Sequence, residues 1–373
     1  MNHGISVREM LHGEESKVRD FFEENLGVID RIIFPLAFRD ALKSAAKQLG
    51  TTLLALSNGE IVGSVSLRIV VYSEKRIGLI DAIVTDKNLR GRGIGKSLLD
   101  EALSWFEKKD CEIIYATADR FNSPSWNMFI HRGFSPHELP GQLRDLGFDF
   151  IRLWFTEFYI IGGGTFFLKK TSGKERRGEA GEGWHFLIGW LGFAFISWMM
   201  AFRQGALFDI PLTLGVAGLS LFTHELAHKL VASHFGLKTT FKAWDSGILF
   251  SSLLAAILGA LYPAYGSTYI KQVDWRYDPK QKGTGLIYVA GPIVSLILAA
   301  LFWASLPYFS NELLMIGKMG YVTNYVLVIF NLIPIQAAGG FAWDGRKIYS
   351  WNKTVWTLLA IAIGLLILAD RLL

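Results

Sequence analysis

Long stretches almost free of charged side chains dominate the second half of this 373-residue chain. About 20 apolar residues are needed for a helix to cross the hydrocarbon core of a bilayer. Six stretches are therefore candidate membrane segments: 184–202, 205–235, 246–270, 283–311, 319–343 and 354–369. All of them except 205–235 contain no Asp, Glu, Lys or Arg. The sequence predicts a membrane domain of five or six helical segments.

Charged residues divide the chain into two parts. Residues 1–183 contain 50 Asp, Glu, Lys and Arg side chains, whereas residues 184–373 contain 21 and account for the whole net charge of +5. A basic excess confined to the apolar part argues against a nucleic-acid partner. The single cysteine, Cys111, excludes an internal disulfide and a cysteine-based metal cluster. We expect an α/β domain at residues 1–168, an exposed basic linker at 169–183 and an all-α membrane domain from 184 to 373.

The basic residues of the linker indicate how the chain is oriented. Five of them precede the first apolar stretch: Lys169, Lys170, Lys174, Arg176 and Arg177. The positive-inside rule then places the N-terminal domain in the cytoplasm. If all six stretches cross, the basic residues near 271–282 and 346–347 lie outside. If 246–264 instead enters the membrane and returns to the same side, both groups of basic residues lie inside the cell. We favour this alternative.

The N-terminal part alternates between the two hydrophobic periods. Helical periodicity occurs at 14–26, 39–49, 93–109 and 125–132. Runs typical of strands occur at 52–56, 61–71, 76–85 and 112–118, and two aromatic-rich strands are predicted within 148–168. This alternation predicts a mixed α/β domain.

A glycine-rich turn follows the strand that ends near Thr85. It reads Arg90-Gly91-Arg92-Gly93-Ile94-Gly95-Lys96 and opens an amphipathic helix. Glycines let a ligand approach the backbone, and the unpaired first amides of a helix attract an anion. The pattern is typical of a pyrophosphate site, although a dinucleotide fingerprint or a plain tight turn has the same glycines.

A second motif lies inside an apolar stretch, where His224, Glu225 and His228 form an HExxH pattern. Histidines four residues apart share one face of a helix and can bind one zinc ion, with the glutamate as general base. Two surface histidines beside a glutamate are the alternative in a soluble helix, but ionisable groups in a membrane are costly and functional by default. Among candidate third ligands, Asp209 lies about four turns away on the same helix, whereas Asp344 shares the cytoplasmic side in the favoured topology.

The N-terminal part resembles the GCN5-related N-acetyltransferases (GNAT). The resemblance rests on the Arg90–Gly95 turn and on the downstream sequence NSPSWNMFIHRGF. It implies an α/β GNAT-like fold and an acetyl-CoA site formed by Val84, Arg90, Gly91, Arg92, Gly93, Ile94, Gly95, Lys96 and Asn122. Phe129 stands where the family commonly has a tyrosine that protonates the leaving thiolate. Acetyl transfer and CoA sensing therefore both remain open.

The C-terminal part resembles the archaeal site-2 proteases, which are intramembrane zinc metalloproteases. Besides HExxH it has Ala290-Gly291-Pro292 and Asn331-Leu332-Ile333-Pro334, followed by Asp344-Gly345. The resemblance implies that His224, His228 and Asp344 bind zinc and that Glu225 is the general base. Two departures are Ser295, where the family often has asparagine, and a long connection from Pro334 to Asp344.

Together these patterns predict a multi-pass protein of the cell membrane with a cytoplasmic N-terminal domain. Its expected activity is hydrolysis of a transmembrane protein substrate by zinc-activated water. The alternative is a membrane-tethered N-acetyltransferase that uses acetyl-CoA and has a non-proteolytic anchor. A third possibility makes the N-terminal domain a ligand sensor for the protease.

Overall fold

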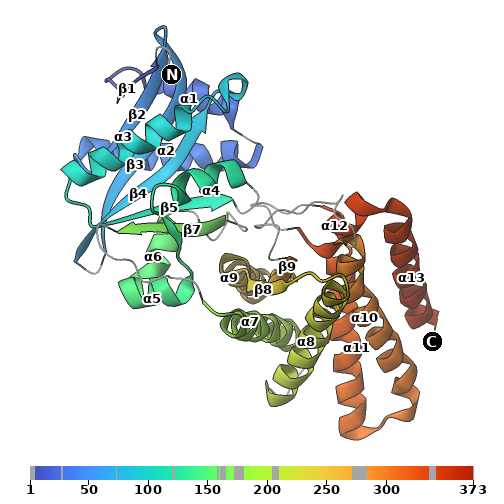
Figure 1. Cartoon of the computed structure of the whole chain (residues 1–373). Helices are drawn as coiled ribbons and strands as arrows, with labels where there is room; N and C mark the ends of the chain where they lie inside the picture. The colour runs from blue at the N-terminus through green and yellow to red at the C-terminus, as the bar shows by residue number, and fades with distance from the viewer. Residues whose placement is uncertain are drawn as a thin grey trace. The chain divides into compact units, whose positions relative to one another are not determined.

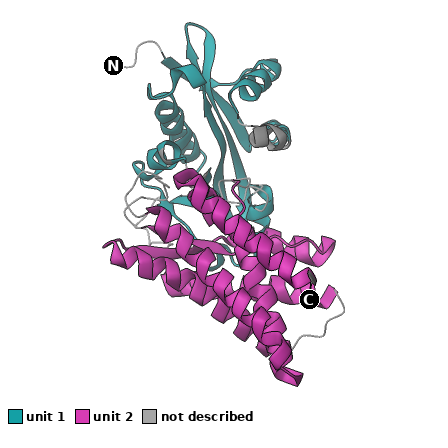
Figure 2. Ribbon diagram, turned by 90° about the vertical axis from the view of Figure 1, so that its right-hand side faces the viewer, with its two compact units in different colours: residues 1–159, 165–179 teal, residues 160–164, 180–373 magenta. Residues whose placement is uncertain are grey.

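The computed structural model describes residues 5–26, 28–72, 74–119, 122–157, 159, 165–171, 180–203, 210–270, 284–335 and 342–372. The chain divides into two compact units. Unit 1 comprises residues 1–159 and 165–179, and unit 2 comprises residues 160–164 and 180–373 (Figure 2).

Unit 1 is built on a seven-stranded sheet in the order β1-β2-β3-β4-β5-β7-β6 (Figure 1). Its strands are β1 (Ile5–Glu9), β2 (Gly50–Ser57), β3 (Glu60–Tyr72), β4 (Lys75–Thr85), β5 (Ile113–Asp119), β6 (Ser135–Pro136) and β7 (Thr165–Thr171). Neighbouring strands are antiparallel except β4 and β5, which are parallel. A parallel pair needs a long crossover, and this one contains α3.

The helices of unit 1 are α1 (Glu15–Asn25), α2 (Val28–Ala46), α3 (Ile94–Lys108), α4 (Ser123–Ile130), α5 (Leu139–Leu146) and α6 (Asp149–Thr156), with a 3-10 turn η1 (Lys87–Leu89). The apolar face of α3 is fully buried at Leu98, Leu99 and Phe106. Phe106 packs against β4 at Gly78, where an added Cβ would come within 2.6 Å of the ring. The sheet and α3 thus form one core under the glycine-rich turn.

Several sequence predictions in this unit are wrong in detail. The two strands predicted within 148–168 are instead the helix α6 and the start of one strand, β7. In α6, Leu153 and Trp154 are buried while Ile151 and Phe155 are exposed, which is a helical pattern that aromatic strand propensity concealed. Helix α2 begins at Val28, eleven residues before the predicted start, and contains Pro35. The predicted linker begins too early, because residues 169–171 belong to β7.

Unit 2 contains five helices that are long and apolar enough to cross a membrane within the described residues. They are α7 (Glu182–Arg203), α8 (Ile210–His234), α10 (Thr284–Ser305), α11 (Asn311–Asn331) and α13 (Lys353–Leu372). A short 3-10 turn, η4 (Leu306–Tyr308), follows α10, and a short helix, α12 (Asp344–Trp351), precedes α13. Helices α8, α10 and α11 pack on one another (Figure 1).

The stretch 246–270 does not form a sixth long helix. It contains α9 (Asp245–Leu253) and a π-helical turn η2 (Leu254–Leu258), followed by an extended return. The strand that precedes it, β8 (Thr239–Ala243), pairs antiparallel with the strand at its end, β9 (Gly266–Ile270), so that Ala243 lies opposite Gly266. The two ends of the segment therefore lie beside each other, as the favoured re-entrant alternative requires.

Candidate metal centre and candidate acyl-CoA site

Helix α8 carries the HExxH motif near its middle. His224, Glu225 and His228 are all buried, with exposed fractions of 3% or less. The i, i+4 spacing places the two imidazole rings on the same face of the helix, with ring centroids 4.9 Å apart. The surrounding α8 sequence is apolar, so the rings and the carboxylate are enclosed by helix packing.

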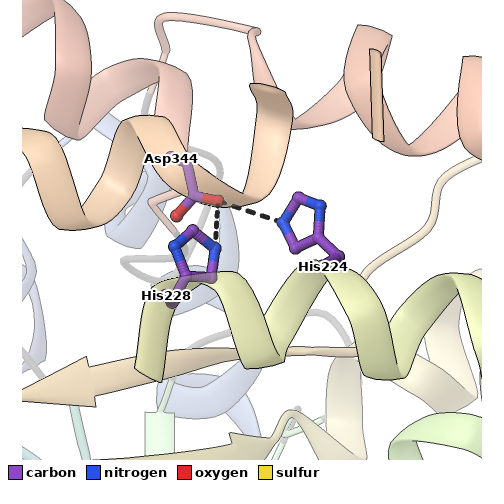
Figure 3. Close-up of side chains that lie close together, drawn as sticks. All are labelled: His224, His228 and Asp344. Atoms are coloured by element: carbon purple, nitrogen blue, oxygen red, sulfur yellow. Dashed lines mark hydrogen bonds and ion pairs between the residues drawn. The ribbon is translucent and has the colours of Figure 1, made fainter. Parts of the chain in front are cut away.

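Asp344 comes to the same place from α12, 116 residues after His228 in sequence. Its Oδ2 lies 3.3 Å from His224 Nε2 and 3.0 Å from His228 Nε2 (Figure 3). One ligand atom from each of the three residues lies within 4.8 Å of the others. The structure thus brings together the three residues proposed as ligands. Asp209 lies outside the described residues.

The far nitrogens of both rings are held from α10. His228 Nδ1 donates to the carbonyl oxygen of Ile287 at 2.7 Å, and His224 Nδ1 lies 2.9 Å from Ser295 Oγ. A histidine that donates from Nδ1 presents an unprotonated Nε2, which is the form that binds a metal. These contacts therefore fix the orientation of both rings, and Ser295 holds that of His224.

Gly291, in the Ala-Gly-Pro segment of α10, faces the space between the rings. A Cβ added there would lie 2.4 Å from His228 Nε2 and 2.6 Å from His224 Nε2. Glycine is thus required by the two nitrogens themselves, and the space that its missing side chain leaves adjoins both. Two imidazole nitrogens and a carboxylate oxygen are a donor set of catalytic zinc sites, so the residues fit that metal.

Glu225 is held by a different element. Thr268 on β9 donates from Oγ1 to Glu225 Oε2 at 2.5 Å.

Two buried asparagines of α11 connect neighbouring segments of unit 2. Asn331 Nδ2 donates to the hydroxyl of Tyr265 at 3.0 Å, so Asn331 ties the end of α11 to the segment that leads into β9. Asn324 donates to Ser220 Oγ and joins α11 to α8. Asn324 therefore links two helices, and Asn331 links α11 to the extended segment before β9.

Sequence reasoning missed the hydroxyl groups of β9 and the side chain of Lys347, which contacts Asp344. Lys347 Nζ lies 3.3 Å from Asp344 Oδ1 and 2.9 Å from Ser267 Oγ. A helical i, i+3 spacing from Asp344 could have found Lys347 once α12 was expected. Nothing in the spacing of Ser267 and Thr268 points to their partners, which are 80 and 43 residues away.

The glycine-rich turn of unit 1 has an open surface. Gly91 and Gly93 have φ angles of 81° and 85°, and a Cβ added at either would meet nothing within 4 Å. Gly93 is the N-cap of α3, which begins at Ile94. Since the first amides of a helix have no partner within the helix, the turn presents donors and a positive dipole end to an incoming anion.

Beside this turn the sheet separates. Within the described residues β4 and β5 pair only from Ile77 to Ile80, although β4 continues to Thr85. Asp81 lies at a bulge in the β3–β4 pairing. Bulges and unpaired strand ends leave backbone groups available to a ligand that enters between the strands.

Asn122 and Val84, which were also predicted for this site, have structural contacts, and so does Phe129. The Asn122 side chain accepts from the Ser125 amide at 3.3 Å and so caps α4. Val84 is 6% exposed and belongs to the core beneath α1. Phe129 is buried and packs edge-on against Phe134, with ring centroids 5.1 Å apart.

Asp81, the carboxylate nearest the turn on β4, is already paired. Arg68 binds both of its oxygens, each at 2.6 Å, and also lies 3.3 Å from Glu157 Oε1. Burial raises the pKa of Glu157 well above its usual range, and the neighbouring Asp81 carboxylate raises it further. This buried cluster holds Asp81 in a structural ion pair.

Comparison with known proteins agrees with the fold of unit 1. Residues 17–134 match the model of the acetyltransferase (GNAT) family. Solved structures similar to this chain include an acetyltransferase of the GNAT family from Staphylococcus aureus Mu50, 16% identical, covering 45% of this chain and 99% of that one with a TM-score of 0.34. Another is the PaiA N-acetyltransferase from Thermoplasma acidophilum in complex with coenzyme A, 14% identical, with the same coverage and a TM-score of 0.33.

One curated protein is similar over 170 residues, at 28% identity, covering 45% of this chain and 84% of its own length. It comes from Methanocaldococcus jannaschii, and its name describes it provisionally as a zinc metalloprotease. Unit 1 therefore has an α/β GNAT fold, and the region that follows it is helical, with five candidate membrane spans among the described residues.

Proposed function

We propose that unit 2 is a membrane-embedded zinc endopeptidase. The observation that carries the proposal is the convergence of His224 Nε2, His228 Nε2 and Asp344 Oδ2 beside Glu225, all buried among candidate membrane helices. Ionisable groups in such surroundings are costly and mark functional sites. The similarity to a protein named as a metalloprotease supports the same assignment.

The chain supplies each group that peptide hydrolysis needs. His224, His228 and Asp344 would hold the metal, and zinc in such a site supplies a Lewis acid that lowers the pKa of a water molecule. Glu225, oriented by Thr268, would accept the proton of the attacking water and pass it to the leaving amine. The water oxygen bonds to the peptide carbon while the carbon–nitrogen bond breaks, so the products are a carboxylate and an amine.

The depth of the site suggests the class of substrate. His224 lies ten residues before the end of α8, which corresponds to about 15 Å along the helix axis. If α8 crosses the bilayer, the site lies at hydrocarbon depth, where a transmembrane segment of a protein substrate would meet it. That segment must unwind locally, because helical peptide groups are shielded by their own hydrogen bonds. We place the N-terminal unit in the cytoplasm on the positive-inside rule.

Metal analysis of the purified full-length chain tests the metal centre. We expect about one zinc per chain in the wild type and a large loss in His224→Ala and Asp344→Ala. Glu225→Gln should keep the metal while losing cleavage of a model transmembrane substrate, because it removes the base and no ligand. A wild type without stoichiometric metal would contradict the proposal, and so would a Glu225→Gln protein that cleaves at the wild-type rate.

For unit 1 we propose acetyl-CoA binding at the turn between β4 and α3. The open φ-positive glycines and the family match support this site. Its proposed residues are Val84, Arg90, Gly91, Arg92, Gly93, Ile94, Gly95, Lys96 and Asn122. Phe129 provides no hydroxyl, so acetyl transfer would need another proton donor. A role in sensing the bound cofactor would need none.

Titration of the full-length chain with acetyl-CoA separates these roles. Binding without turnover of amine acceptors would support sensing, and binding with turnover would support a transferase. An absence of binding at millimolar acetyl-CoA would remove both. A membrane-tethered acetyltransferase with a non-proteolytic anchor requires turnover of an amine acceptor together with a unit 2 that cleaves no peptide bond, whether or not it binds a metal.

A further inference from the structure

Lys347 is a buried cation beside the candidate metal centre, and the proposed reaction leaves it without a role. It lies one turn after Asp344 on α12 and is 2% exposed. Its Nζ lies 4.2 Å from the centroid of the Tyr288 ring and 5.7 Å from that of Tyr269. A buried ammonium group is costly unless its surroundings compensate it, so a position this enclosed needs a reason.

The two oxygens of Asp344 face different partners. Oδ2 is directed at both histidine Nε2 atoms, at 3.0 and 3.3 Å, whereas Oδ1 lies 3.3 Å from Lys347 Nζ. The ammonium group is in turn held by Ser267 Oγ at 2.9 Å. These contacts oppose rotation of the carboxylate about its Cβ–Cγ bond. Its Oδ2 faces the two histidines, and its Oδ1 faces the ammonium group of Lys347.

We propose that Lys347 is a positioning residue that makes Asp344 a one-oxygen metal ligand. The inference rests on the proposed metal centre and concerns how its third ligand binds. For both carboxylate oxygens to reach the metal, Oδ1 would have to leave the ammonium group inside a buried, low-dielectric site. Lys347 opposes that rotation, and a fourth coordination position stays open, as catalytic centres require.

Strand β9 supports both acidic groups of the centre in this arrangement. Thr268 holds Glu225 directly, and Ser267 holds Asp344 through Lys347. The GSTYI segment thus aligns the base and the third ligand from two successive residues. Mutation of residues that hydrogen-bond to metal ligands commonly lowers metal affinity or activity by about 10- to 100-fold.

The test uses the full-length chain loaded with cobalt(II), whose visible absorption reports coordination number. Four-coordinate cobalt absorbs more strongly than five-coordinate cobalt, so two-oxygen binding by Asp344 lowers the band intensity. We expect Lys347→Met to bind cobalt with reduced intensity and Lys347→Arg to restore the wild-type spectrum. Lys353→Met is the matched control, because Lys353 is exposed at the start of α13 and should leave the spectrum unchanged.

The outcomes separate this inference from the proposed function. A Lys347→Met spectrum identical to that of the wild type would overturn the positioning role, and so would an Arg variant that behaves like the Met variant. Failure of the wild type to bind cobalt or zinc would instead overturn the metal centre itself. Circular dichroism of each variant distinguishes a changed ligand from an unfolded protein.

Discussion

Gly291 is the residue at which the backbone of α10 meets the two imidazole rings of α8. The Ala290-Gly291-Pro292 motif is visible in the sequence, but the sequence does not show which atoms the glycine approaches. The structure does, since a Cβ at this position would be 2.4 and 2.6 Å from the two Nε2 atoms. A single methyl group would thus compete with a metal for the same nitrogens.

Gly291→Ala should therefore remove most of the bound metal. We expect a loss of affinity on the order of 10- to 100-fold, because the rings must rotate away from their partners on α10. Zinc content measured by mass spectrometry checks this. Gly215→Ala is the control, since a Cβ at Gly215 on α8 meets nothing within 4 Å. Equal zinc in both variants would contradict the packing argument.

Thr268→Val removes the hydrogen bond to Glu225 while preserving side-chain shape. Because Glu225 is 3% exposed, its carboxylate would lose a buried donor and its fixed orientation. We expect peptidase activity to fall roughly tenfold with unchanged zinc content. Activity and metal measured on the same preparation check the prediction, and loss of both together would indicate misfolding instead.

The candidate ligands were predictable to different degrees. His224 and His228 follow from spacing within one helix, which is a local property. Asp344 needed an argument about membrane topology, because 120 residues separate it from His224. Ser295 and Thr268 contact their partners across 71 and 43 residues, and hydroxyl groups in apolar segments have many structural uses. Their roles depend on tertiary packing that one sequence does not reveal.

At the scale of elements, the junction of β4 and α3 carries the candidate acyl-CoA site. The strand, the glycine-rich turn and the helix were all predictable, because turn glycines and helical periodicity are local patterns. Helix α6 was not, since Phe, Trp and Ile favour strands while burial of Leu153 and Trp154 on one face selects a helix. Tertiary packing decides such short aromatic segments.

Gly93→Ala tests the turn. An alanine at a φ of 85° is strained by roughly 1–2 kcal/mol, and relief of that strain would move the first amides of α3. We expect acetyl-CoA affinity, measured by calorimetry, to fall about 5- to 30-fold. Gly13→Ala is matched, because Gly13 has a φ of 93° and the same open space. A similar loss in both variants would assign the effect to general strain.

The ion pair between β1 and the start of α1 predicts a pH dependence of stability. Arg8 binds both Glu14 oxygens at 2.7 and 2.8 Å, and this hydrogen bonding, with the Leu11 amide, lowers the pKa of Glu14 to about 2. Because the folded pKa is below the unfolded value of 4.5, the stabilisation is complete above about pH 4.5 and is lost as the pH falls towards 2.

Arg8→Met should accordingly lower the unfolding temperature at pH 7 by roughly 1–5 °C, as for an exposed pair. The difference from the wild type should shrink below pH 4.5. Thermal unfolding of unit 1 followed by circular dichroism measures both. Arg39→Met serves as the control, because its contact with Asp40 is 3.9 Å long. A difference that grows at low pH would refute the sign of the argument.

At the scale of the whole molecule, composition already separates the two units. Charge and hydropathy are summed over many residues, so they are insensitive to local errors in the sequence interpretation.

The single cysteine offers a test of orientation, because Cys111 lies in unit 1. Burial raises the pKa of its thiol. Since the thiolate is the reactive form, labelling should accelerate above neutral pH.

We expect a membrane-impermeant maleimide to label Cys111 in inverted membrane vesicles and not in intact cells. Mass spectrometry of the purified chain measures the fraction labelled, and Cys111→Ser sets the background. Labelling of intact cells at the same rate would place unit 1 outside and reverse the proposed orientation.

The pairing of β8 with β9 has a further consequence for the two ends of unit 2. If the segment between them is re-entrant, as this pairing favours, it adds no crossing to those of the five long helices found in the described residues. Five crossings make an odd number, so Glu182 and Arg371 face opposite compartments if each helix spans. The two ends of unit 2 then lie on opposite sides of the bilayer. Reporters attached beside these two residues should give their signals in different compartments.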